Sequence, residues 1–230
     1  MPSLILIPGL FCNQALWSSQ IADLLEYTEI MVADITRQPT IAQMAEAILA
    51  TAPAHFSLAG FSLGSQVALE IIRTGKDRVD RLALLSATHG GVLPPVEKAL
   101  HAAIATIEQG GFDQYLETSY PTYVAAPSFE DARLKQTFTK MAYGVGAEAG
   151  VRQMRALLEI KTPFTGLDEI RCPTVIIGGR EDRRTTPAAH KALAREIPGS
   201  KLDFIDHAAH FTPLEQPGAV TELLRHWITL

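Results

Sequence analysis

Short runs of apolar residues recur along the chain, and each has the length of a β-strand. The runs cover residues 4–7, 30–35, 56–61, 81–85, 174–177 and 201–205. Segments with helical periodicity separate most of them, and strands this continuously apolar are typical of a parallel sheet covered on both faces. Right-handed crossovers then place helices on both sides. The pattern therefore predicts an α/β fold in which helices flank a mostly parallel, six-stranded sheet.

Three threonines precede segments with helical periodicity, and each is a predicted helix N-cap: Thr40, Thr186 and Thr212. Gln43 and Glu215 stand three residues after Thr40 and Thr212, as in a capping box. A proline directly follows Thr186 and Thr212, at a position where a helix tolerates it. These signals predict several junctions between loops and helices.

Residues 90–165 interrupt the alternation of strands and helices. The segment opens near Leu93-Pro94-Pro95 and continues with amphipathic stretches that contain no strand-like run. We expect a helical cap here, inserted into a core formed by residues 1–89 and 166–230. Such an insertion would lie over the carboxyl edge of the sheet, where open α/β sheets bind their ligands.

Composition and charge narrow the possible partners. The chain has 230 residues, of which 47% are hydrophobic and 20% charged, so it can bury a large core and should fold alone. Its formal net charge of −5 comes from mixed signs with no basic block. Because phosphate backbones and anionic bilayers attract clusters of lysine and arginine, we expect neither nucleic acid nor a membrane as a partner.

Cysteine usage and the N-terminus bear on the cell compartment. Cys12 and Cys172 lie far apart and lack the spacing of a zinc site, so we expect no metal and a reducing environment. The first residues have no basic region before the short apolar run, and no apolar stretch is long enough to span a bilayer. These features predict a cytoplasmic protein.

The strongest chemical signal is the segment Gly60-Phe61-Ser62-Leu63-Gly64, which lies between a predicted strand and a predicted helix. A nucleophile elbow needs this arrangement, because two glycines relieve crowding while a strained turn lifts the serine hydroxyl clear of the sheet. The following helix directs backbone N–H groups at developing negative charge. The motif can arise by chance, but its strand and helix context favours Ser62 as a nucleophile.

A serine nucleophile needs a base, and the base needs an orienting acid; both are expected downstream of Ser62. Asp182 follows the predicted strand that ends at residue 177 and is the predicted acid, with neighbouring Glu181 as its competitor. Two histidines follow the last predicted strand. His210 is nearer the next helix and is the predicted base, whereas His207 adjoins the strand end and is the alternative.

Acyl transfer also needs donors for the oxyanion of its tetrahedral intermediate. The backbone N–H of Leu63, directly after the serine, is the first predicted donor. The loop after the first strand supplies the second, for which the N–H of Leu10 is best placed because Gly9 permits a close turn. The alternative is that this loop is merely a turn that ends a strand.

Together these motifs resemble the α/β-hydrolase superfamily over almost the full length of the chain, in particular its short bacterial members with a helical cap. The resemblance rests on residues 6–10 with Trp17, residues 60–64, residues 179–182 with Thr186, and His210 with residues 215–217. It implies a Ser-His-Asp hydrolase that uses no cofactor. Three places depart from the family pattern without removing a catalytic group: Pro8, Ser65-Gln66 and Ala208-Ala209.

The resemblance favours hydrolysis of a small ester, thioester or related acyl substrate through an acyl-enzyme. The fold also supports carbon–carbon bond hydrolysis, lyase and haloperoxidase chemistry with the same three residues, and a non-catalytic ligand-binding protein is the alternative from another class. A small molecule is the expected substrate. Neither its identity nor the oligomeric state follows from the sequence.

Two sets of residues in the predicted cap are candidates for contact with a substrate. Arg152 and Arg155 would share one helix face and could hold a carboxylate, although a solvated basic face is the favoured interpretation. Seven aromatic residues could line an apolar pocket, with the core of the cap as their favoured place. They are Phe112, Tyr115, Tyr120, Tyr123, Phe129, Phe138 and Tyr143.

Overall fold

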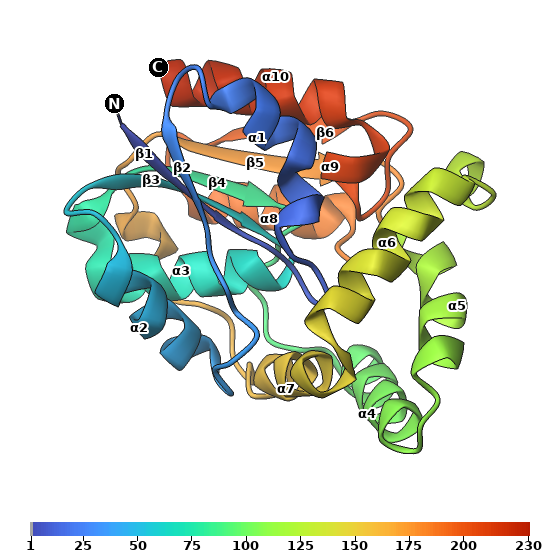
Figure 1. Ribbon diagram of the computed structural model, residues 1–230. Helices are drawn as coiled ribbons and strands as arrows, with labels where there is room; N and C mark the ends of the chain where they lie inside the picture. The colour runs from blue at the N-terminus through green and yellow to red at the C-terminus, as the bar shows by residue number, and fades with distance from the viewer. Residues whose placement is uncertain (1) are drawn as a thin grey trace.

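The structure of the chain, a computed structural model, describes residues 2–230 and confirms the predicted α/β architecture. The strands are β1 (Ser3–Ile7), β2 (Glu29–Val32), β3 (Phe56–Phe61), β4 (Val79–Leu85), β5 (Thr174–Gly179) and β6 (Lys201–Ile205). All neighbouring strands pair in parallel, in the order β2-β1-β3-β4-β5-β6 (Figure 1). Every residue of β3 and of β5 is buried, as central strands covered on both faces require.

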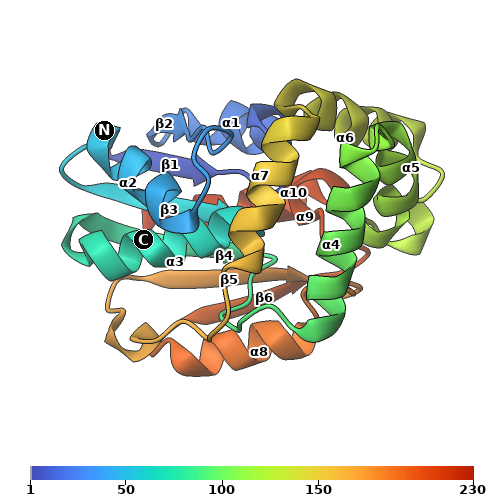
Figure 2. The same ribbon diagram turned by 90° about the horizontal axis from the view of Figure 1, so that it is seen from below.

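Helices cover both faces of this sheet. The α-helices of the described residues are α1 (Ser18–Leu24), α2 (Ile41–Thr51), α3 (Leu63–Gly75), α4 (Pro94–Glu108), α5 (Phe112–Tyr123), α6 (Ala132–Val145), α7 (Ala147–Leu158), α8 (Pro187–Glu196), α9 (Thr212–Glu215) and α10 (Pro217–Thr229). Short 3-10 helices are η1 (Gln14–Trp17), η2 (Lys76–Arg78), η3 (Ala126–Ser128) and η4 (Leu167–Glu169). α1 and α10 lie side by side on one face, and α2, α3 and α8 cover the other (Figures 1 and 2). The segment between β4 and β5 holds α4 to α7, which gather beyond the carboxyl ends of the strands in Figure 2.

One strand ends earlier than its apolar pattern predicts. β2 stops at Val32, whereas the apolar run continues to Ile35. Ile35 is buried all the same, but its carbonyl oxygen accepts a hydrogen bond from Gln153 Nε2 of α7 at 3.2 Å. The prediction is wrong there because the run leaves the sheet to pack against a helix distant in sequence.

Two of the three predicted caps are confirmed. Thr40 and Thr186 accept hydrogen bonds from backbone amides in the first turns of α2 and α8. The prediction for Thr212 is wrong, because α9 begins at Thr212 itself, with Phe211 at the N-cap. The Thr212 hydroxyl is buried and has no hydrogen-bond partner within residues 2–230, and Glu215 is engaged elsewhere.

The strand order locates a crevice. The chain runs from β1 outward to β2 and returns to β3 on the other side of β1, so the loops after β1 and β3 diverge at a topological switch point. Ile7 at the end of β1 pairs with Gly60 near the end of β3. The Pro8-Gly9-Leu10 loop therefore lies beside Ser62.

Candidate active site

Ser62 occupies the sharp turn between β3 and α3. Its φ of 52° and ψ of −113° are unfavourable for a residue with a side chain, and its amide donates to the Leu85 carbonyl at 2.9 Å. A Cβ on Gly60 would lie 2.4 Å from the Gly64 oxygen, and one on Gly64 would lie 2.3 Å from the Ile7 oxygen. Both glycines are needed because the backbones approach too closely for any side chain.

Ser65, one of the positions that depart from the family pattern, braces the same turn. Its hydroxyl donates to the Gly60 carbonyl at 2.7 Å and lies 3.1 Å from the Leu85 carbonyl, and it is fully buried. A glycine could not make these contacts. The substitution therefore adds hydrogen bonds at the elbow instead of only changing helix packing.

Three side chains form a continuous hydrogen-bonded line. His210 Nε2 lies 2.8 Å from Ser62 Oγ, and His210 Nδ1 lies 2.8 Å from Asp182 Oδ2. The Asp182 side chain is 0% exposed and that of His210 is 4% exposed. A carboxylate at Nδ1 favours the tautomer that carries its proton there, which leaves Nε2 free to accept the serine proton.

His210 and two backbone amides favour the ionised form of Asp182. Its Oδ1 accepts from the amides of Arg184 at 2.8 Å and Thr185 at 2.9 Å. Burial alone would raise the pKa of the Asp182 carboxyl, but the charge and hydrogen bond of His210 and the two amides outweigh burial and keep its pKa below the ordinary value. The carboxylate is thus available to orient the histidine at neutral pH.

Contacts that the sequence did not reveal position the histidine. The His210 amide donates to the Tyr123 carbonyl at 2.9 Å, and the Ser86 hydroxyl donates to the His210 carbonyl at 2.7 Å. The imidazole packs between the rings of Phe61 and Tyr123, whose centroids lie 5.4 and 5.7 Å away. These partners come from three other elements, and no local signal in the sequence marks them.

The competing residues lie away from the serine. His207 is exposed, with a φ of 56° in the turn after β6, and Glu181 is also exposed. Asp206, a further carboxylate that follows β6 and could take the place of Asp182, forms an exposed ion pair with Arg180. The structure thus brings together Ser62, Asp182 and His210, while leaving these alternatives in solvent.

The two residues whose amides are predicted to bind an oxyanion, Leu10 and Leu63, lie close to Ser62. Leu10 and Leu63 both line a cavity next to Ser62, and neither amide donates a hydrogen bond to another residue of the described chain. The loop after β1 approaches the elbow so closely that a Cβ on Gly9 would lie 2.8 Å from the Phe61 ring. The next amide, that of Phe11, donates to Gln153 Oε1 of α7 at 3.1 Å, which ties this loop to the helices above it.

The cavity has a volume of about 800 Å³ and extends from Ser62 toward α4. Its wall is mostly apolar, with Val92, Leu100 and Ile160 among the lining residues. Of the seven aromatic residues considered, Tyr123 and Phe129 line it. Phe112 and Tyr115 pack against Phe11 of the loop after β1, Tyr120 and Phe138 pack against each other, and Tyr143 is exposed.

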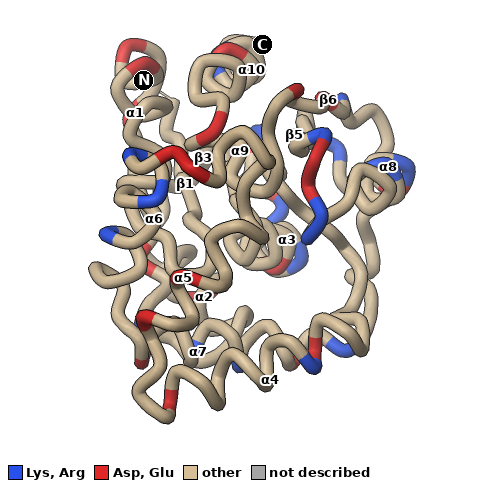
Figure 3. The backbone as a smooth tube through the Cα atoms, turned by 90° about the vertical axis from the view of Figure 1, so that its right-hand side faces the viewer, with Lys and Arg blue, Asp and Glu red and all other residues tan. Residues whose placement is uncertain are grey.

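The arginines that line this cavity are not the ones considered from the sequence. Arg152 donates to the Thr36 carbonyl at 3.1 Å and Arg155 pairs with Glu108, so both serve structural contacts outside the cavity. Arg183 and Arg184, directly after Asp182, line it instead. In Figure 3 the loop after β5 shows basic residues on both sides of acidic ones. Their sequence position beside the acid was the available signal.

The buried Cys12 is not a competing nucleophile. Burial raises the pKa of the Cys12 thiol to about 12, so this thiol stays protonated and is a poor nucleophile. No three histidine, cysteine or carboxylate side chains converge as a metal site requires within residues 2–230. No helix in that range combines the length and apolar character needed to cross a bilayer.

Comparisons with known proteins agree with this fold. The chain is 26% identical to the pimeloyl-[acyl-carrier protein] methyl ester esterase of Aromatoleum aromaticum, with 94% of each chain covered. Among solved structures it is similar to the enol-lactonase of Burkholderia xenovorans (TM-score 0.90, 20% identity, 100% of this chain and 92% of that one). It is also similar to an esterase of Thermogutta terrifontis (TM-score 0.87, 21% identity, 100% and 90%).

A profile of the whole family covers nearly the entire sequence. The description of this family is "Alpha/beta hydrolase family", and the match extends over residues 4–223, from β1 into α10. The match includes the elbow, the Asp182 loop and the His210 loop. The chain therefore belongs to the alpha/beta hydrolase family and is a hydrolase.

Proposed function

We propose that this protein hydrolyses a small ester or related acyl compound, with Ser62 as nucleophile, His210 as general base and Asp182 as the residue that orients the histidine. The observation that carries the proposal is the pair of 2.8 Å contacts that links a buried carboxylate through the imidazole to the serine hydroxyl at the cavity wall. Aligned nucleophile, base and orienting acid are what serine acyl transfer requires.

In the proposed acylation step, His210 Nε2 takes the proton of Ser62 as Oγ attacks the acyl carbon. The buried carboxylate of Asp182 stabilises the imidazolium that forms. The former carbonyl oxygen becomes an oxyanion and accepts hydrogen bonds from the amides of Leu10 and Leu63. As the intermediate collapses, the imidazolium gives its proton to the departing alkoxide and the acyl group remains on the serine.

Deacylation uses water in the same way. His210 takes a proton from a water molecule whose oxygen attacks the acyl carbon, and the same amides hold the second oxyanion. The imidazolium then returns its proton to Ser62 Oγ as the carboxylic acid leaves. The chain's own residues supply every proton transfer in this cycle.

The position of the helical segment over the cavity favours a small, partly apolar substrate. We assign residues 90–165 as a cap on a core of residues 1–89 and 166–230, because α4 supplies part of the wall above Ser62. By their names, two of the similar proteins act on a methyl ester and an enol-lactone, and both bonds are carboxylic esters. An apolar cavity of about 800 Å³ suits an acyl group of several carbons.

A fluorophosphonate probe tests the nucleophile directly. We expect peptide mapping to find the label on Ser62, with loss of ester turnover, while Ser62→Ala removes labelling and lowers kcat about a thousandfold or more. Ser18→Ala, which changes an exposed serine, is the matched control and should behave like the unmodified protein. Labelling at another residue, or near-normal turnover by Ser62→Ala, would reject the mechanism. A panel of esters, thioesters and carbon–carbon substrates defines the bond that is cleaved.

A further inference from the structure

The cavity beside Ser62 has an uneven charge. Its lining contains two arginines, Arg183 and Arg184, and no aspartate or glutamate. Neither guanidinium forms an ion pair with a carboxylate in residues 2–230, and the nearby Asp182 is occupied by His210 and two backbone amides. A mostly apolar cavity with uncompensated positive charge attracts an anionic ligand.

The first arginine is engaged in holding the cap helices. Arg183 Nη2 donates to the carbonyls of Pro121 at 3.0 Å and Val124 at 3.2 Å, at the C-terminal end of α5. Its guanidinium also lies over the Phe129 ring, 5.7 Å from the centroid. These contacts stabilise terminal helix carbonyls, so Arg183 has a structural role.

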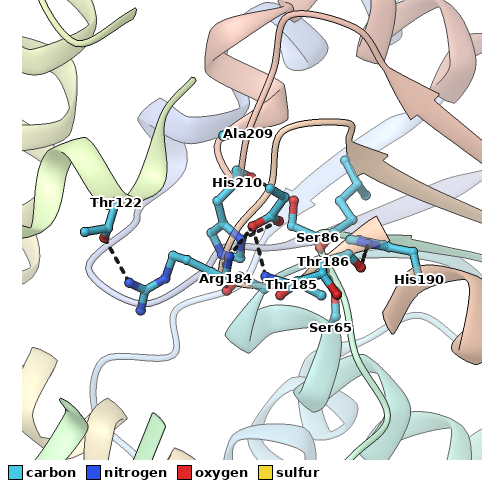
Figure 4. A network of polar contacts seen from close by, with 12 residues as sticks. Ser65, Ser86, Thr122, Arg184, Thr185, Thr186, His190, Ala209 and His210 are labelled. Atoms are coloured by element: carbon cyan, nitrogen blue, oxygen red, sulfur yellow. Dashed lines mark hydrogen bonds and ion pairs between the residues drawn. The ribbon is translucent and has the colours of Figure 1, made fainter. Parts of the chain in front are cut away.

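The second arginine keeps donors free. Arg184 Nη1 donates to Thr122 Oγ1 at 3.0 Å, and its guanidinium stacks on Tyr123 at 4.1 Å from the ring centroid. Figure 4 shows this side chain extending from the loop near His210 to Thr122. Its Nε and Nη2 atoms have no acceptor within residues 2–230. Arg184 is an exposed residue that lines the cavity, so these N–H groups are available to a ligand that reaches it, and the contacts with Thr122 and Tyr123 restrain the side chain.

The position of Arg184 fits the distal end of a substrate. The Tyr123 ring on which it stacks lies 5.7 Å from the His210 ring, so the guanidinium and the proposed base contact the same aromatic ring. A substrate that reacts at Ser62 and reaches Arg184 must span that ring with a short apolar chain. A planar carboxylate at its far end can accept two parallel hydrogen bonds from a guanidinium.

We propose that Arg184 is an anion-binding residue and that the preferred substrate is an ester carrying a free carboxylate several carbons from the scissile bond. This inference rests on the proposed ester hydrolysis at Ser62. Monomethyl adipate and its neutral primary amide, methyl adipamate, form a suitable pair because they differ only in the charge of the distal group. Methanol release measures the hydrolysis of both.

We expect Arg184→Met to raise KM for monomethyl adipate about tenfold or more, while kcat/KM for methyl adipamate changes by less than about threefold. Arg184→Lys keeps the charge but loses the paired donors, so it should recover part of the loss. Arg180→Met is the control, because Arg180 lies on the same loop but pairs with Asp206 outside the cavity; it should change neither substrate. The proposal is overturned if the unmodified protein has the same kcat/KM for monomethyl adipate and methyl adipamate. It is also overturned if Arg184→Met lowers kcat/KM equally for both.

Calorimetry separates this proposal from the proposed function. Monomethyl adipate should bind the Ser62→Ala protein, methyl adipamate should bind at least tenfold more weakly, and adding Arg184→Met should abolish the difference. If the unmodified protein hydrolyses no ester but binding of monomethyl adipate depends on Arg184, the anion site is supported and the hydrolytic function is rejected. If esters are hydrolysed but monomethyl adipate and methyl adipamate bind equally well, the anion site is rejected and the hydrolytic function is supported.

Discussion

At the scale of single residues, backbone groups hold each member of the proposed triad. The Ser62 amide donates to the Leu85 carbonyl, the His210 amide donates to the Tyr123 carbonyl, and two amides of its own loop hold Asp182. Backbone partners move less than side chains do. The three side chains of the proposed triad are therefore positioned before a substrate arrives, which is the condition for efficient acyl transfer by the proposed mechanism.

The acid is tested by Asp182→Asn. The amide keeps the shape of the side chain, but its NH2 group facing His210 Nδ1 would favour the tautomer with a proton on Nε2, which cannot accept the serine proton. We expect kcat to fall about a thousandfold or more, with a smaller change in KM, in steady-state ester assays. Glu181→Gln and Asp206→Asn, which alter exposed carboxylates nearby, should stay within about twofold. If Asp182→Asn keeps its kcat while Glu181→Gln or Asp206→Asn loses most of it, another carboxylate orients the histidine.

At the scale of elements, the half-buried carboxylate of Glu215 joins the His210 loop to the helical segment. Glu215 at the end of α9 accepts from the amide of Ala209, next to His210, at 2.9 Å and from the amide of Ala125, next to η3, at 2.6 Å. Burial raises the pKa of the Glu215 carboxyl despite these hydrogen bonds, which lower it in part. The tie between the two segments is therefore sensitive to pH.

Glu215→Gln exposes this sensitivity. With a raised folded-state pKa, the folded chain retains the Glu215 proton to a higher pH than the unfolded chain does, so the free energy of unfolding falls as pH rises above the ordinary value of 4.5. Glutamine does not ionise, so residue 215 contributes no such decrease in the free energy of unfolding to the Glu215→Gln variant. We expect the stability advantage of the unmodified protein over Glu215→Gln, measured by urea denaturation, to be larger at pH 4.5 than at pH 7. A constant or growing advantage would contradict the raised pKa. Glu181→Gln, at an exposed position, should show no such trend.

The elements themselves could be predicted where their signals are local. Buried strands such as β3 and β5 have continuous apolar sequences, and Thr40 and Thr186 cap helices next to them in sequence. The end of β2 and the role of Thr212 could not be predicted, because distant contacts override the local pattern there. An apolar residue such as Ile35 signals burial but does not specify what covers it.

At the scale of the whole molecule, the site depends on contacts between core loops and the helices above them. The family motifs on three loops could be recognised from sequence, and the parallel sheet brings these loops to one edge. The position of Arg184 beside the predicted acid was the one signal for it, but its contact with Thr122, 62 positions away in sequence, could not be predicted. Such pairings depend on how the helical segment sits on the sheet.

The contact between α7 and the loop after β1 provides a direct test of how the helical segment packs on the core. Gly150 of α7 lies so close to the loop after β1 that a Cβ there would be 1.7 Å from Phe11 Cε1. The Phe11 ring is itself packed by Phe112 and Tyr115, with centroids 5.4 and 5.5 Å away, and cannot swing aside freely. Gly150→Ala should therefore displace either the helix or the loop, although alanine favours a helix.

We expect Gly150→Ala to lower the free energy of unfolding by about 1–3 kcal/mol, as overpacking typically does, and to lower kcat about tenfold or more. The effect on kcat should exceed the effect on KM, because Phe11 follows Leu10, whose amide is proposed to act only on the oxyanion of the transition state. Gly218→Ala on α10 is the matched control, since a Cβ on Gly218 would meet no atom within 4 Å. It should leave kcat unchanged and stabilise the fold by up to about 1 kcal/mol. Identical behaviour of the two variants in urea denaturation and ester assays would mean that α7 does not position the loop after β1.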